Sequence, residues 1–114
     1  MEKRNRKEQI RAYKERRLTG GVLKITNRST GRYLLLGETN LQGSRNRFAF
    51  SVATNTCIYA KLREDWNRYG ADSFSFEVLE EIEKKEDQTD EQFREDVKIL
   101  ADLWREKEPS DLAY

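Results

Sequence analysis

The residues available for chemistry in this chain are carboxylates, lysines, arginines and tyrosines. Its 114 residues include no histidine and a single cysteine, Cys57. Acid–base pairs built on histidine, serine triads and the usual zinc sites are therefore excluded. Cys57 has no histidine to act as its base, so we expect an ordinary small residue there and not a nucleophile. What remains is chemistry in which oxygen ligands hold a hard cation or positive side chains face a polyanion.

Charge is divided along the sequence, although the formal net charge is only +1. Between Lys3 and Arg17 there are eight lysines and arginines against two glutamates. Beyond Leu79, as far as Glu91, acidic residues outnumber basic ones. A basic arm followed by an acidic segment predicts one end that faces a polyanion and one that faces water. A charged surface helix without a partner is the alternative.

Length and composition indicate one small domain. The hydrophobic share is 36% and the charged share 38%, which allows a modest core under a strongly charged surface. No apolar run approaches the roughly 18 residues that a bilayer requires, and the charged N-terminus lacks a signal-peptide core. A single cysteine fits a reducing compartment, so the chain is predicted to be cytoplasmic and away from membranes. The sequence gives no sign of an organic cofactor.

The elements that would position a site begin with a helix and a hairpin. Residues 2–17 contain good helix formers and predict an exposed basic helix that ends at Thr19 and the glycines after it. Residues 21–26 and 33–36 are rich in apolar and β-branched residues, and residues 27–32 have turn chemistry. These two runs therefore predict a β-hairpin.

Two helices and a third strand are predicted to follow. Asn40 can cap a helix that runs to about Phe50. Helical spacing then predicts a buried stripe that ends at Gly70 and consists of Ile58, Tyr59, Leu62, Trp66 and Tyr69. Alternation of Phe74, Phe76 and Val78 with polar residues predicts a strand with one buried face.

The last helix has the clearest start. Thr89 and Gln92 form a capping-box pattern, an apolar face follows with helical period, and Pro109 bars continuation. The whole order predicts an α+β fold, in which helices flank a three-stranded antiparallel sheet. The predicted units are a basic helix over residues 1–19, a domain over 20–108 and a tail over 109–114.

Several short strings resemble the GIY-YIG nuclease superfamily over roughly residues 20–105. They are GVLKITN at residues 21–27, Leu35-Leu36-Gly37, and WNRYG at residues 66–70 with FSFEVLEEI at residues 74–82. The resemblance implies a three-stranded antiparallel sheet flanked by helices. It also implies nucleic acid, DNA in particular, as the partner, and phosphodiester hydrolysis with Mg²⁺ or Mn²⁺. In the family a glutamate holds the ion, an arginine steadies the phosphate and tyrosines help to activate water.

The resemblance assigns roles to particular residues of this chain. Arg45, eight positions beyond Gly37, stands where the phosphate-binding arginine is expected, and Arg47 is a second phosphate contact. Lys24 and Arg32 are further nucleic-acid contacts. Glu95 stands where the metal-binding glutamate of the last helix is expected. A fixed cation and a forked guanidinium would both stabilise the charge that develops on a phosphodiester under attack.

The chain departs from the family where the two signature tyrosines belong. Leu23 and Leu35 occupy those positions, and leucine cannot activate water. Tyr33, two residues before Leu35 on the same face of the strand, is the candidate substitute.

Three functions follow from these departures. The chain is a metal-dependent endonuclease of unusual site chemistry, a catalytically inactive nucleic-acid-binding module, or a protein-interaction module derived from the nuclease fold. Fold alone does not choose between them.

Overall fold

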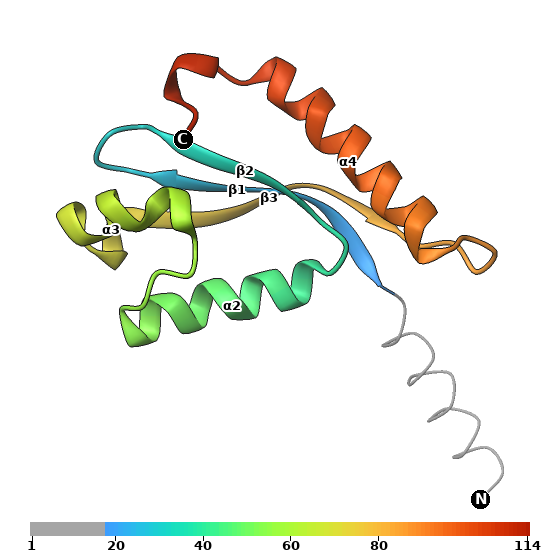
Figure 1. Cartoon of the computed structure of the whole chain (residues 1–114), viewed down its shortest axis with the longest axis horizontal. Coiled ribbons are helices and arrows are strands. Elements are labelled where there is room, and N and C mark those ends of the chain that lie inside the picture. Colours follow the sequence, from blue (N-terminus) through green and yellow to red (C-terminus); the bar gives the residue numbers. More distant parts are fainter. Residues whose placement is uncertain (1–17) are drawn as a thin grey trace, which may run out of the picture.

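The computed structural model describes residues 18–114, and the helix predicted over residues 2–17 lies outside this range (Figure 1). The elements are β1 (Thr19–Asn27), β2 (Tyr33–Glu38), α2 (Leu41–Thr54), α3 (Arg63–Tyr69), β3 (Phe74–Glu83) and α4 (Asp90–Lys107). Three short 3₁₀ turns, Ala60–Leu62, Ala71–Ser73 and Ser110–Leu112, join or follow them. Among residues 18–114, no helix has the length and apolar character that crossing a membrane requires.

The three strands form one antiparallel sheet in the order β2-β1-β3, so β1 is the central strand. Helices α2 and α3 cover one face of the sheet and α4 covers the other (Figure 1). The predicted α+β class, with helices around a three-stranded antiparallel sheet, is confirmed. Because successive side chains of β1 point to opposite faces, this strand supplies residues to two separate cores.

The two cores differ in size and composition. The core under α2 and α3 contains an aromatic stack, in which Trp66 lies 5.0 Å from Phe74 between ring centroids. Its buried members are Leu23, Ile25, Leu34, Leu41, Leu62, Trp66 and Phe74. The core under α4 is smaller, with buried members Val22, Tyr33, Leu35 and Ala101.

Helix α2 starts where the sequence predicts and ends later. The Asn40 side chain accepts a hydrogen bond from the Gly43 amide at 3.0 Å, which confirms the predicted cap. The helix then continues past Phe50 to Thr54 and ends at Asn55, whose left-handed φ of 52° stops it. Asparagine adopts the left-handed conformation at low cost. The sequence signal for the end of α2 is therefore Asn55, within the polar residues 54–56.

The stripe predicted over residues 58–69 is only half correct. Leu62 and Trp66 are buried, whereas Ile58 is 45% exposed and Tyr69 is 39% exposed. Helical structure begins only at Ala60, as a 3₁₀ turn, so Ile58 precedes it and does not share its face. The predicted end at Gly70 is confirmed, with φ at 88°.

Helix α4 follows the sequence closely. Both bonds of the capping box are present, from the Gln92 amide to Thr89 at 3.1 Å and from the Thr89 amide to Gln92 at 2.9 Å. Phe93, Val97 and Ala101 are buried against the sheet. The helix ends at Lys107, two residues before Pro109, as the sequence predicts.

Residues 109–114, predicted as a tail, pack against the edge of the sheet. Ala113 forms a parallel bridge with Tyr33, and the Tyr114 amide donates to the Tyr33 carbonyl at 2.9 Å. The Tyr114 hydroxyl donates to Asp65 at 2.7 Å and accepts from the fully buried Asn27 at 3.0 Å. A network of three side chains therefore ties the hairpin, α3 and the C-terminal residue together.

Two glycines of the motif-like strings allow the backbone to pack closely. A Cβ at Gly21, where φ is 151°, would lie 2.0 Å from the Glu80 carbonyl oxygen, beside the irregularity in pairing between β1 and β3. A Cβ at Gly37 would lie 3.0 Å from Val97 and from Ala101 of α4. Gly21 therefore needs glycine for packing, independently of any chemistry, whereas a methyl group at Gly37 would require its α4 neighbours to move by a few tenths of an ångström.

The first prediction concerns Gly21. Gly21→Ala places a methyl group against the Glu80 carbonyl and adds an unfavourable φ, so we expect unfolding free energy to fall by about 3 kcal/mol. Gly31→Ala is the matched control, because Gly31 has a positive φ of 81° but open space around its Cβ position. The control should lose only about 1 kcal/mol. Urea unfolding measures both, and equal losses would show that the close approach is unimportant.

The second prediction concerns the Tyr114 hydroxyl. Burial raises the pKa of Tyr114; the hydrogen bond from Asn27 opposes this, and Asp65 adds to it. The neutral phenol is thus favoured on folding. Its contribution is complete below the ordinary tyrosine pKa near 10 and is lost as pH rises through the raised value.

We therefore expect Tyr114→Phe to lower stability by about 1 kcal/mol near neutral pH and to reduce the alkaline loss. Urea unfolding near pH 7 and above pH 10 tests this, with the more exposed Tyr69→Phe as control. An alkaline loss of the same size in Tyr114→Phe as in the unchanged protein would contradict it.

Candidate nucleic-acid interface

Arg45 is an exposed residue of α2, and its guanidinium is held in place by an aromatic ring. Its Cζ lies 5.4 Å from the centroid of Phe76 on β3. Stacking of this kind orients a guanidinium while leaving its N–H groups at the edge of the plane. Among residues 18–114, no ion pair ties Arg45 to a carboxylate. The side chain is thus oriented and its charge is available to an anion.

Arg47 lies at the other side of the same helix, near the end of β2. It donates to the Ser44 hydroxyl at 3.2 Å, and its Nη2 is 3.9 Å from the Glu38 carboxylate. Its side chain is 54% exposed, so this ion pair is weakly held. Helix α2 contains no acidic residue, and its first turn offers no charge that would compensate the positive end of the helix dipole. The N-terminal half of α2 is therefore attractive to anions.

A tyrosine beside Arg47 was not singled out as a site residue by sequence reasoning. Burial raises the pKa of Tyr59; Arg47 opposes the shift and Glu38 adds to it, so the three charged or polar groups are close enough to interact. A raised pKa keeps the phenol protonated near neutral pH, as a hydrogen-bond donor and not a base. The sequence signal for Glu38 is its position directly after the Leu35-Leu36-Gly37 string. The sequence predicts Tyr59 as part of the buried stripe and gives no signal for a site residue there.

The two signature positions lie on opposite faces of the sheet. The register pairs Leu23 with Leu36, so Leu35 points to the other side. Leu23 belongs to the core with Trp66, and Leu35 to the core with Ala101. Tyrosines placed at both positions would therefore not meet in one site.

Tyr33 shares the face of Leu35, as the sequence predicts, and is only 4% exposed. The Lys24 ammonium lies 5.0 Å from its ring centroid. Its ring therefore fills the α4-side core, and solvent has little access to it.

Lys24 and Arg32 are both occupied by neighbouring groups. The Lys24 ammonium donates to Glu108 at 3.0 Å. Arg32 lies over the Tyr114 ring at 4.2 Å and 3.8 Å from Asp65. Each charge thus has a carboxylate nearby, unlike that of Arg45.

Glu95 lies on the solvent side of α4. It is exposed, and at 100° per residue it is about 200° from the buried Phe93 and Val97. Since α4 and α2 cover opposite faces, the structure does not bring Glu95 and Arg45 together (Figure 1). Within residues 18–114, there is no group of three or more histidine, cysteine, aspartate or glutamate side chains that could hold a metal. An exposed carboxylate outside any such group does not fit the divalent ion that the resemblance implies.

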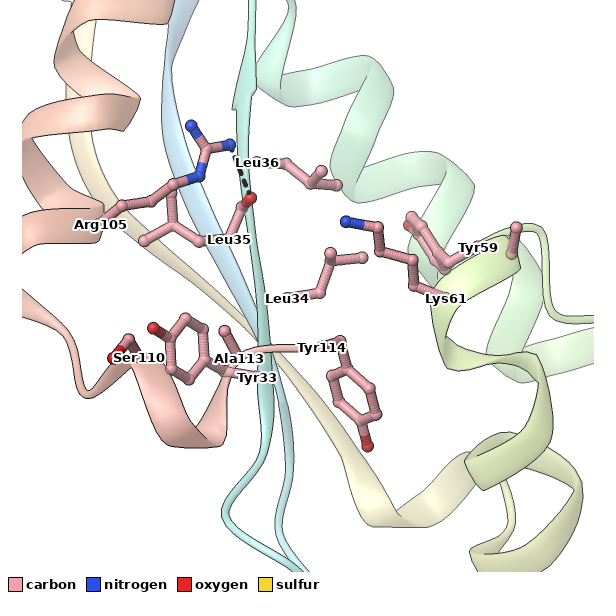
Figure 2. Close-up of a pocket in the computed structure, with 11 residues that line it drawn as sticks. Tyr33, Leu34, Leu35, Leu36, Tyr59, Lys61, Arg105, Ser110, Ala113 and Tyr114 are labelled. Carbon is pink, nitrogen blue, oxygen red and sulfur yellow. Dashed lines mark hydrogen bonds between the residues drawn. The ribbon is translucent and has the colours of Figure 1, made fainter.

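A cavity of about 430 Å³ runs along the outer edge of β2, next to this group of residues (Figure 2). Lys61 and Arg105 approach it from opposite sides, and the lining contains no aspartate or glutamate. Arg105 donates to the Leu35 carbonyl at 3.3 Å and is paired with Asp102 at 2.7 Å. Three tyrosines, Tyr33, Tyr59 and Tyr114, complete the wall. Lys61 and these rings therefore bring positive charge and aromatic surface to the sheet edge.

Comparisons with known proteins gave a structural likeness and no family. No protein-family model and no curated protein matches the chain. Among solved structures, the chain is similar to a point mutant of the catalytic domain of the intron endonuclease I-TevI. The identity is 20% and the TM-score 0.46, and the match covers 73% of this chain and 84% of that domain.

Proposed function

We propose that this chain binds nucleic acid across the exposed surface of α2, with Arg45 on the β3 side of the helix and Arg47 on the β2 side as phosphate contacts, and that binding needs no metal. The observation that carries the proposal is a helix with two arginines, no acidic residue and an uncompensated N-terminus. Guanidinium groups bind phosphate through two parallel hydrogen bonds, which gives both energy and orientation. Arg45 is already oriented for this by the Phe76 ring.

An arriving phosphate would compete with Glu38 for Arg47. Their separation of 3.9 Å and their exposure make this pair worth little, on the order of 0–1 kcal/mol. A phosphate offers more acceptor oxygens than one carboxylate and can also accept from the protonated Tyr59. Lys61, on the cavity wall, extends the same surface.

An exposed aromatic ring on the same helix supports a nucleic-acid partner. Phe50 is 63% exposed and lies three residues beyond Arg47, on a neighbouring part of the helix surface. An aromatic ring beside arginines is the combination with which proteins stack unpaired bases while holding the backbone. A ring in this position has no role in the core, because the buried residues of α2 are Leu41, Ser44 and Ser51.

Binding without hydrolysis is favoured by the surroundings of the expected catalytic residues. Leu23 and Leu35 fill separate cores, Tyr33 is buried, and Glu95 faces solvent on the far side of the sheet. None of these residues shares a surface with Arg45. None of the expected catalytic residues is therefore placed to remove a proton from a water that attacks a phosphate at Arg45.

The third prediction separates phosphate contacts from base contacts. Arg45→Ala and Arg47→Ala should each weaken binding of a fluorescent single-stranded DNA about 3- to 10-fold near 100 mM salt. Each should also reduce the slope of log affinity against log salt by about 1, because one counterion fewer is released. Phe50→Ala should weaken binding without changing that slope.

Lys98→Ala is the matched control, since Lys98 is an exposed cation on α4, at the opposite face of the sheet. Anisotropy titrations in EDTA give all these affinities. If Lys98→Ala weakens DNA binding as much as Arg45→Ala, DNA binds cations on either face of the domain. That result would contradict a binding site on α2.

The fourth prediction concerns hydrolysis. Incubation of plasmid DNA with the protein and Mg²⁺ or Mn²⁺ should give no more nicking than EDTA controls, for the reasons of geometry above. Glu95→Gln should leave DNA affinity unchanged. Metal-dependent nicking that disappears in both Arg45→Ala and Glu95→Gln would instead establish the endonuclease.

A further inference from the structure

A second concave surface lies between the end of β3 and α4. It is a groove of about 490 Å³, and we call it the β3–α4 groove. Its apolar floor includes Ile82 of β3 with Ile99 and Leu103 of α4, and its lining also contains Asp96. Ile99 is 52% exposed and Leu103 is 50% exposed, and their spacing of four residues makes them neighbours on one side of α4.

A row of carboxylates runs along the solvent side of this groove. Glu91, Glu95, Asp102 and Glu106 are all exposed residues of α4, and Asp102 is paired with Arg105 at 2.7 Å. At 100° per residue they fall within a sector of about 60° that borders Ile99. The groove thus offers an apolar stripe with an acidic border, which is complementary to a basic amphipathic segment.

The chain enters β1 directly beside this groove. Thr19 pairs with Glu83, and the Lys84 amide donates to the Leu18 carbonyl at 3.1 Å. Glu83 and Lys85 are themselves lining residues of the groove. Whatever precedes Leu18 in the sequence therefore starts next to the β3–α4 groove and has a high effective concentration there.

The preceding residues have the composition that the groove would accept. Eight lysines and arginines lie between residues 3 and 17, against two glutamates. In a helix, Ile10 and Tyr13 would share a face, with Lys14 and Arg17 four positions beyond them on the same side. Tyr13 is five residues from Leu18, and five residues of chain can span at most about 17 Å, so a groove that begins beside Leu18 is within reach.

We propose that residues 1–17 bind the β3–α4 groove of their own chain, with Ile10 and Tyr13 on Ile99 and Leu103 and the basic side chains against the carboxylate row. The interaction is intramolecular and combines apolar burial with charge pairing. Glu95 then serves as part of an acidic border for the arm. This proposal is independent of nucleic-acid binding by α2.

Disulfide trapping tests the contact in the full chain. In a Cys57→Ser background, Tyr13→Cys is combined either with Ile99→Cys or with the control Ala53→Cys, which is exposed on α2 at the opposite face. At low protein concentration, we expect the Ile99 pair to form a disulfide within one chain at least about 10-fold faster than the control pair. Equal rates in the two pairs, or covalent dimers as the main product, would overturn the proposal.

Limited trypsin digestion gives an independent measurement, because the arm is rich in cleavage sites. Ile99→Glu with Leu103→Glu removes the apolar stripe at half-exposed positions, and the melting temperature shows whether the fold is retained. We expect cleavage within residues 1–17 to become about 10-fold faster than in the unchanged protein or in Ala53→Glu. Unchanged cleavage in a folded double variant would refute the contact, even if the α2 surface binds DNA as proposed.

Discussion

Strand β1 is covered on both faces, and this places the strictest demand on the sequence. Val22 is fully buried toward α4, while Ile25 is fully buried toward α2 and α3. Both neighbouring strands and two helix layers must approach the same nine residues. Close approach of backbones is possible at Gly21, where β3 passes, and at Gly37, where α4 crosses β2. The two glycines that carry the resemblance in the hairpin therefore have a structural explanation.

The alternation of side chains along β1 and β2 determines which residues can lie together on one face of the sheet. Because side chains alternate, an offset of one residue in the pairing of β1 with β2 sends a side chain to the other face. Leu23 pairs with Leu36 and not with Leu35, so the two signature positions feed two different cores. Apolar residues are appropriate there, since each leucine packs in a cluster of buried hydrophobic side chains. The positive surface has instead formed on α2, outside both cores.

Much of the fold follows from local signals in the sequence. The cap at Asn40, the capping box at Thr89 and the stop before Pro109 depend on neighbouring residues, so they are predictable. The register of the hairpin depends on the geometry of a five-residue connection, residues 28–32, which the sequence does not specify uniquely. The docking of Tyr114 against Asn27 and Asp65 joins residues far apart in the chain and has no local signature. In the candidate site, the exposure of Arg45 could be predicted from the sequence. The separation of Arg45 from Glu95, and the interaction of Arg47 with Tyr59, depend on which helix covers which face of the sheet, and the sequence does not show this.

The opposite charge of the two helix layers has a consequence for encounters in solution. Helix α2 carries two arginines and no acid, whereas α4, across the sheet, carries six acidic and four basic residues. The described domain is therefore an electric dipole directed through the thickness of the sheet. In the field of a polyanion such a body experiences a torque that turns α2 forward before any contact is made. Productive orientation would then be selected during diffusion, and the association rate would fall with ionic strength more steeply than the net charge alone suggests.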